Sequence, residues 1–342
     1  MRKVLFAVTY LILSILIFSA CSANDDLSTP RKIHINILFT PESFCIIGYN
    51  DIALKAIETY SHKYGYEYSF CVPESIEEGM NYYTNWCLSE MDDDISRSLF
   101  IFASKLYEEP LSKAPHPTAN PLKDVLIFEV DKELPYAYSF DISYYGASYL
   151  IGCYYSSFLS AKYHIIAANP YLDSLHEVID GFTAATQDMA SGTVNTQYLS
   201  SSPYGGLDED NKAFLSCQLE YVLNSDITNI FIPYAGLSNL GVYRFSQYNH
   251  QLAVGVDCIN PDLFSFIPLS MNKRIDLALD DFLQQWINGN EIPKFTFYDL
   301  ESGKVVVDKT SFLDSDSAKL DSLFTHAIAK EKEYYLNNGA DE

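Results

Sequence analysis

Segments with the composition of strands and segments with the periodicity of helices alternate along almost the whole chain. Residues 33–39 and 66–72 are short apolar or β-branched runs, and residues 143–159 form a helix that is apolar almost all round. The clearest helical pattern has apolar residues at i, i+3, i+4, i+7, i+8 and i+11, ended by Gly289: Ile275, Ala278, Leu279, Phe282, Leu283 and Trp286. This alternation predicts an α/β protein with parallel sheets.

The number of strands indicates two lobes. Roughly ten strands over about 310 residues are too many for a single small Rossmann unit. We therefore predict two Rossmann-like lobes joined by a hinge, and in doubly wound sheets ligands bind beyond the carboxyl ends of the strands. The predicted segments are lobe 1 at 32–140, lobe 2 at 141–254, and crossover segments with a C-terminal helix at 255–342. The hinge is placed at crossings near Phe140 and Val254, and residues 295–307 are predicted to form a hairpin around Gly303.

The N-terminus has the features of a secretory signal. Arg2 and Lys3 precede an apolar run that ends at Cys21. Small residues just before a cysteine resemble the lipobox of bacterial lipoproteins, in which the cysteine becomes the lipidated first residue. We predict a signal peptide at 1–20, lipidation of Cys21 and a polar tether at 21–31. The alternative, an uncut signal anchor, is disfavoured because the run is short for a spanning helix of about 20 residues.

The charge restricts the partners. The chain has 22 Lys and Arg against 45 Asp and Glu, a formal charge of −23. Removing residues 1–20 removes two positive charges, which gives the mature chain −25 (−23 minus 2). A protein needs a basic face to bind nucleic acid. With this net charge, the protein is repelled by nucleic acid and by anionic lipid surfaces. A small uncharged ligand is compatible with this negative net charge.

Motifs of common catalytic sites are absent. The sequence contains no phosphate loop, no GxSxG nucleophile elbow, no HExxH and no GxGxxG. The six cysteines after Cys21 form no CxxC pair, so zinc is not expected, and most of them are predicted to be buried apolar residues. We expect no cofactor, no metal and no enzymatic activity.

Five segments in chain order resemble the basic membrane protein family, the purine-nucleoside-binding lipoproteins of bacterial ABC importers. They are Gly48-Tyr49-Asn50-Asp51, residues 146–152, residues 178–184, residues 234–242, and Gly255-Val256-Asp257 followed by residues 269–276. The resemblance covers most of residues 33–310. It implies a fold like that of type I periplasmic binding proteins and an ABC permease as partner. It also implies a lipid-anchored protein in the cell envelope, facing the periplasm or the exterior, that binds a small ligand, with a nucleoside as the leading candidate.

The same resemblance points to aromatic and amide contacts with a base. Tyr49 would stack on a purine, and base–aromatic stacking is worth about 1–3 kcal/mol. Tyr234 is a second candidate stacking surface. Asn50 offers a donor and an acceptor to a base edge. The structural alternatives are a core aromatic beneath the loop for Tyr49 and a helix N-cap for Asn50.

Three further residues would contact the sugar or the backbone of the site. Asp257 ends a strand and would accept hydrogen bonds from two ribose hydroxyls, or it serves as a turn residue. Lys273 would reach the sugar or pair with Asp257, or it is a solvated charge. Gly236 would let the backbone approach the ligand closely, although turn geometry also explains a glycine there.

The chain departs from the family at places that bear on the ligand. Ile46 stands where relatives have an acidic residue, Leu207 replaces an aromatic, and Leu237 and Asn239 replace glycines. These changes affect the ligand prediction more than the fold prediction. An alternative function is a ligand-sensing lipoprotein that signals to a membrane receptor, and a hydrolase on the same scaffold is a third. Neighbouring genes for a permease and an ATPase, or for a receptor, would separate the first two.

Overall fold

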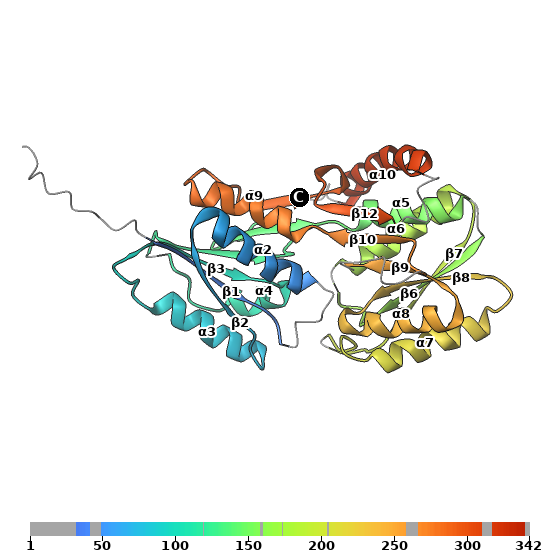
Figure 1. Cartoon of the computed structure of the whole chain (residues 1–342), viewed down its shortest axis with the longest axis horizontal. Coiled ribbons are helices and arrows are strands. Elements are labelled where there is room, and N and C mark those ends of the chain that lie inside the picture. The colour runs from blue at the N-terminus through green and yellow to red at the C-terminus, as the bar shows by residue number, and fades with distance from the viewer. Residues whose placement is uncertain are drawn as a thin grey trace, which may run out of the picture.

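The computed structural model consists of two α/β lobes joined by several chain crossings (Figure 1). It describes residues 32–41, 49–118, 120–157, 160–172, 174–203, 205–257, 266–309 and 317–338. The predicted signal peptide, tether and lipidated Cys21 lie outside the described residues, as do Cys45, Ile46 and Cys258. In the described part, no helix has both the length and the apolar character needed to cross a bilayer.

The first lobe contains a six-stranded, fully parallel sheet in the order β11-β5-β4-β3-β1-β2. One face packs against α2 (Tyr49–Tyr64) and α9 (Ile275–Ile287), the other against α3 (Ile76–Leu88) and α4 (Glu108–Ser112). Both faces are covered, so the strands are near-continuous apolar runs. The strands are β1 (Lys32–Leu38), β2 (Glu67–Cys71), β3 (Ile95–Phe102), β4 (Lys123–Phe128), β5 (Tyr138–Ile142) and β11 (Phe295–Tyr298).

The second lobe repeats this plan with the order β12-β10-β9-β8-β6-β7, parallel except for β12. Helices α5 (Tyr145–Ser156) and α6 (Leu175–Asp188) cover one face, with α10 (Ser317–Asn338) packed outside α5, and α7 (Asp210–Leu223) and α8 (Asn239–Asn249) cover the other. The strands are β6 (Ala161–Ala167), β7 (Thr193–Tyr198), β8 (Thr228–Tyr234), β9 (Leu252–Val256), β10 (Leu269–Lys273) and β12 (Val305–Lys309). The predicted two-lobed α/β architecture is confirmed.

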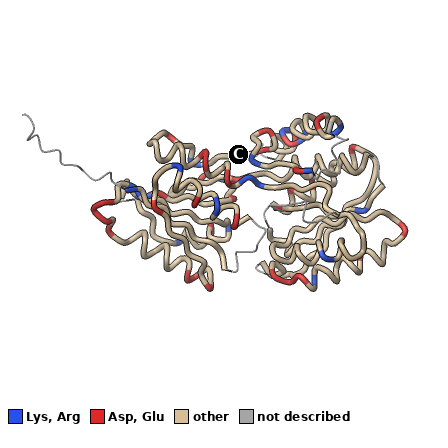
Figure 2. Tube along the Cα trace, viewed as in Figure 1, with Lys and Arg blue, Asp and Glu red and all other residues tan. Residues whose placement is uncertain are grey.

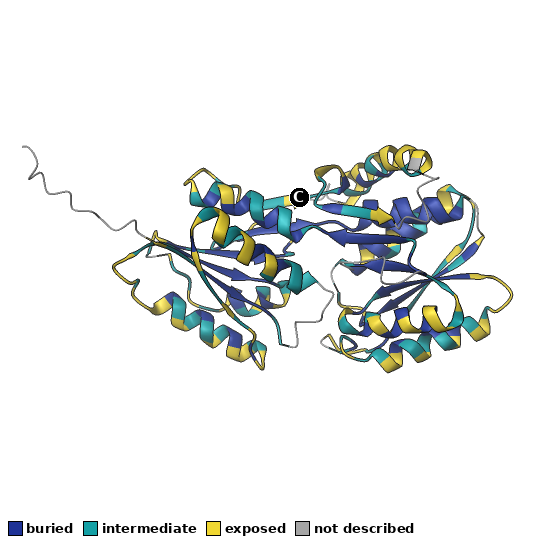
Figure 3. Ribbon diagram, viewed as in Figure 1, coloured by how far each residue is buried: buried dark blue, intermediate teal, exposed yellow. Residues whose placement is uncertain are grey.

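Two helix predictions are confirmed in detail. Every residue of α5 is buried, as its apolar circumference predicts, and all six periodic positions of α9 are buried (Figure 3). Glycines let α5 and α6 approach closely, because a Cβ on Gly152 would lie 2.6 Å from the Ala185 Cβ and one on Gly181 2.7 Å from the Tyr145 carbonyl oxygen. These glycines of the family-like segments therefore serve helix packing.

The chain passes between the lobes at three places, and two of them differ from the prediction. The first follows β5, close to the expected Phe140. The predicted crossing near Val254 is wrong, because Val254 lies in β9 and pairs with β10 inside the second sheet; the chain crosses only after Lys273. The predicted hairpin at 295–307 is also wrong, because β11 joins the first sheet and β12 the second. Long-range strand pairing overrides the local turn signal at Gly303.

Helix α10 fixes two of these crossings through a buried carboxylate. Glu331 is 1% exposed and accepts hydrogen bonds from the backbone N–H groups of Gly146 (3.1 Å) and Leu300 (2.8 Å). Burial raises the pKa of Glu331, while these N–H groups lower it. The C-terminal helix thus joins the start of α5 to the segment between β11 and β12.

Candidate ligand-binding site

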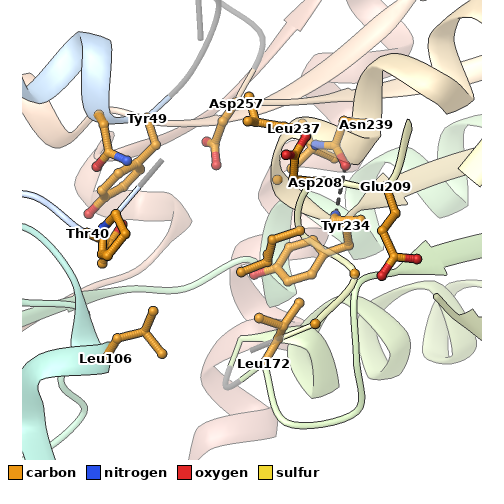
Figure 4. A pocket seen from close by; sticks show the side chains of 18 of the residues that line it. Thr40, Tyr49, Leu106, Leu172, Asp208, Glu209, Tyr234, Leu237, Asn239 and Asp257 are labelled. Carbon is orange, nitrogen blue, oxygen red and sulfur yellow. Dashed lines mark hydrogen bonds between the residues drawn. The ribbon is translucent and has the colours of Figure 1, made fainter. Parts of the chain in front are cut away.

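A cavity of about 680 Å³ lies between the lobes, where the carboxyl ends of both parallel sheets face each other. This is the place where doubly wound sheets bind ligands. Figure 4 shows Thr40 and Tyr49 on one wall and Tyr234, Leu237 and Asn239 on the other. We call it the ligand cavity; its described lining is Thr40, Pro41, Tyr49, Asn50, Ile76, Leu106, Leu172, Gly205, Gly206, Leu207, Asp208, Glu209, Tyr234, Ala235, Gly236, Leu237, Asn239, Val256 and Asp257.

The structure brings five of the six sequence-predicted ligand residues to this cavity. Tyr49 and Asn50 come from the start of α2, Tyr234 and Gly236 from the end of β8 and the turn after it, and Asp257 follows β9. These segments are far apart in the sequence, and each follows or opens an element whose end faces the other lobe. The sixth residue, Lys273, does not belong to the described lining.

Tyr49 belongs both to the hydrophobic core and to the lining of the cavity. The Tyr49 hydroxyl donates a hydrogen bond to Glu129 Oε1 at 3.1 Å. Burial and the Glu129 carboxylate raise the pKa of Tyr49, so its hydroxyl stays protonated as a donor. Asn50 lies inside α2 rather than at an N-cap, because the helix already includes Tyr49.

Tyr234 and Gly236 form the opposite wall. The Tyr234 ring meets the Tyr144 ring edge-on, with centroids 5.9 Å apart, which holds the ring at the end of β8. Gly236 has φ +57, a conformation that favours glycine, and a Cβ there would lie 3.3 Å from the Leu207 carbonyl oxygen. Both turn geometry and close packing therefore favour this glycine.

Asp257 is a half-buried carboxylate held by backbone contacts. It has φ +46, and its Oδ1 accepts the Lys273 backbone N–H at 3.0 Å. Its own N–H donates to the Met271 carbonyl at 3.1 Å. Burial raises the pKa of Asp257, opposed by the neighbouring Tyr144 hydroxyl and the Lys273 backbone. The turn therefore presents a carboxylate to the cavity without a cationic side chain bound to it.

Lys273 is neither a solvated charge nor a side-chain partner of Asp257. Its side chain is 3% exposed and pairs with Glu129, which follows β4 in the other lobe. The ammonium also lies 4.5 Å from the centroid of the Tyr144 ring. Although burial lowers the pKa of Lys273, the Glu129 carboxylate raises it. The positive charge of Lys273 is thus used in an ion pair between the lobes.

Glu129 contacts Tyr49 of the ligand cavity and was not predicted from the sequence. It follows β4, and its position at a strand end was the available signal. Nothing in the local sequence shows its partners, because Tyr49 and Lys273 lie 80 and 144 residues away. Only the packing of the two sheets brings these three side chains together.

The titration of Glu129 gives a testable pH dependence. Burial raises the pKa of Glu129 from 4.5 to about 7; Lys273 opposes this rise, and Asp141 and Asp257 add to it. In the folded protein Glu129 therefore loses its proton, and gains the charge of its ion pair with Lys273, only near pH 7, whereas the unfolded chain loses this proton near pH 4.5. The resulting stabilisation is complete below pH 4.5 and is lost as the pH rises towards 7.

Glu129→Gln should remove this pH dependence. The free energy of unfolding of the unmodified protein should fall relative to that of Glu129→Gln between pH 5 and 7, by on the order of 2 kcal/mol. Urea unfolding of both proteins at pH 5, 6, 7 and 8 measures this difference. Parallel pH profiles for the two proteins would contradict the assignment.

The charges at the cavity select against anions. Its described lining contains the carboxylates of Asp208, Glu209 and Asp257 and no Lys or Arg. Acidic residues are spread over both lobes (Figure 2). A phosphate or carboxylate in this cavity would meet repulsion, whereas a neutral molecule with hydroxyl or amino groups would find acceptors.

Comparison with known proteins establishes the fold. No family model and no curated protein sequence match the chain. An ABC transporter solute-binding protein from Aeropyrum pernix K1 aligns over 90% of this chain and 88% of its own, with TM-score 0.67 and 15% identity. A transcriptional activator of the comK gene from Bacillus halodurans covers 89% and 98%, with TM-score 0.66 and 18% identity. A periplasmic ribose ABC transporter protein from Conexibacter woesei covers 85% and 96%, with TM-score 0.61 and 10% identity.

The chain has the type I periplasmic-binding-protein fold. This confirms the predicted fold class. At 10–18% identity the likeness defines the fold and leaves the ligand open. Membership of the basic membrane protein family stays a prediction.

Proposed function

We propose that this protein is the solute-binding component of an ABC importer and that it binds a nucleoside in the ligand cavity. The observation that carries the proposal is the cavity itself, which lies between two lobes of the periplasmic-binding-protein type at the carboxyl ends of their strands. Similar folds in the solved structures belong to ABC transporter solute-binding proteins. The predicted signal and Cys21 support a lipid-anchored, extracytoplasmic location, with a permease as partner.

The chemistry of the cavity supports an uncharged ligand with a flat ring and hydroxyl groups. Tyr49 and Tyr234 come from opposite lobes and provide aromatic surface, and Asn50 offers an amide. Asp257 offers acceptors for hydroxyl hydrogen bonds, while the absence of Lys and Arg from the described lining disfavours a phosphorylated ligand. The mechanism is hinge closure, in which the ligand binds the closed state more tightly than the open one.

A thermal-shift screen tests this proposal. We expect purine nucleosides to raise the melting temperature, because a ligand at a hundredfold excess over its Kd stabilises the fold by about 2.7 kcal/mol. The matching 5′-monophosphates should give no shift. Stabilisation by monosaccharides alone would overturn the nucleoside assignment, and the protein would then be proposed to bind a sugar for import. If nucleosides, bases and sugars all leave the melting temperature unchanged, the proposed ligand class is wrong.

The second candidate is a ligand-sensing lipoprotein that signals to a membrane receptor. The observation that favours it is the structural similarity to a transcriptional activator, which shows that proteins with this fold also act outside import. The same cavity would serve both functions. Co-purification of the protein with a permease or with a receptor from its native membrane distinguishes the two.

A further inference from the structure

A second cavity of about 310 Å³ lies between the lobes and shares no described lining residue with the ligand cavity. Glu129 and Ser174 line it. Glu129 interacts with Tyr49 of the ligand cavity, and Ser174 interacts with Tyr234 of the ligand cavity. The Lys273 ammonium contacts both Glu129 and Ser174, the latter at 3.4 Å. The interlobe ion pair therefore stands between the two cavities. We call the second one the acidic cavity.

The acidic cavity has more carboxylates than cations. Glu129 pairs with Lys273, and Asp131 pairs with Lys105 at 3.4 Å. Its two other carboxylates, Asp141 and Glu177, form no ion pair within the described part of the chain, and the remaining basic side chain, His176, is exposed.

Asp141 has an unpartnered oxygen in this cavity. The residue is 8% exposed, and its one hydrogen bond among the described residues joins the Ile142 N–H to Oδ1 at 2.9 Å. Glu177 differs, because its Oε2 accepts the Tyr144 N–H (2.9 Å) and its Oε1 accepts the Tyr335 hydroxyl (2.6 Å). Asp141 Oδ2 is therefore free to accept a donor from a ligand. The charge of Lys273 acts on Asp141 without forming an ion pair with it, so Oδ2 still lacks a donor, and a buried acceptor without a donor is energetically costly.

Aromatic side chains complete the walls of the acidic cavity. Phe297 is the register partner of Asp141 across β11 and β5, and both line the cavity together with Phe295. The Phe297 and Tyr335 rings meet edge-on, with centroids 4.6 Å apart. Aromatic faces attract ammonium groups by about 0.5–2 kcal/mol. No described cluster of His, Cys, Asp or Glu is suited to a metal ion.

We propose that the acidic cavity binds a small organic cation through a primary ammonium group, with Asp141 as its acceptor and Phe297 and Tyr335 beside it. The volume equals about ten water molecules, which suits a ligand of a few heavy atoms. An ammonium group supplies three donors, and the aromatic walls accommodate an apolar tail. The proposal does not depend on the nucleoside assignment, because the two cavities share no described lining residue.

A ligand-observed NMR titration of the full chain with n-butylammonium chloride tests the proposal, with 1-butanol as the uncharged isostere. We expect saturable binding of the ammonium and none of the alcohol. Asp141→Asn keeps the acceptor for the Ile142 N–H and removes the charge, so it should raise the Kd at least tenfold. The matched control Asp226→Asn, an exposed residue outside both cavities, should leave the Kd unchanged.

Equal affinity of Asp141→Asn and the unmodified protein would overturn the proposal, as would non-saturable or equal binding of 1-butanol. If Asp141→Asn does not fold by circular dichroism, Phe297→Leu replaces it as the deciding variant, because it keeps all charges. That variant should raise the Kd severalfold, and an unchanged Kd would count against the proposal.

Discussion

Replacing Asp257 with asparagine is expected to weaken binding of the proposed nucleoside ligand at least a hundredfold, which corresponds to about 2.8 kcal/mol of binding free energy. The carboxylate lines the ligand cavity without a cationic side-chain partner, so it can accept hydrogen bonds from two adjacent ribose hydroxyls. The asparagine amide has only one acceptor oxygen. Asparagine tolerates the φ of +46 at this position and can still accept the Lys273 backbone N–H, so the fold should be retained.

Isothermal titration calorimetry measures this effect, and thermal unfolding of the same samples monitors the fold. Asp226→Asn serves as the control, since it removes the same charge from an exposed position away from the cavity. We expect the control to bind like the unmodified protein. An unchanged affinity for Asp257→Asn would remove Asp257 from the site.

Gly206→Ala is expected to lower the free energy of unfolding by about 3–4 kcal/mol. Gly206 has φ +82, and a Cβ at this position would lie 2.2 Å from the Ala168 carbonyl oxygen. The backbone at this point is also held by the Ser238 hydroxyl, which donates to the Gly206 carbonyl at 2.7 Å. Relief of the clash must displace the segment that carries Leu207. Because Leu207 lines the ligand cavity, ligand affinity should fall as well.

Gly303→Ala is the matched control for this prediction. Gly303 has φ +69, and, apart from its chain neighbours, no atom of the described residues lies within 4 Å of a Cβ built there. The control therefore carries only the backbone strain of a left-handed alanine, about 1–2 kcal/mol. Urea unfolding of both variants separates strain from steric exclusion. Equal losses in the two variants would show that the predicted contact with Ala168 is not decisive.

Periodicity predicted the elements because burial on a helix or strand follows the spacing of apolar residues. In α9 a single apolar stripe faces the core, and in α5 every side is apolar because helices and sheet surround it. Five residues of the cavity lining could also be predicted from the sequence, since strand ends and helix starts face the other lobe in this type of fold.

The chain crossings between the lobes and the Lys273–Glu129 ion pair could not be predicted from the sequence in this way. Residues 295–307 read locally as a hairpin, yet β11 and β12 pair with strands of different sheets. Lys273 follows a strand, as does Glu129, but their pairing depends on how the two sheets are placed. Such contacts join residues of large sequence separation, and no local pattern encodes them.

The sequence by itself determined the alternating α/β elements, the two lobes and the segments whose ends could form a site. Local propensity and apolar spacing are sufficient for these, because they act over one or two turns or strands. The tertiary structure alone decided that the Lys273 charge serves Glu129 rather than a ligand, and that the cavity is left with carboxylates. The physical reason is that a buried charge takes the partner that the packed lobes bring within reach, however distant that partner is in the chain.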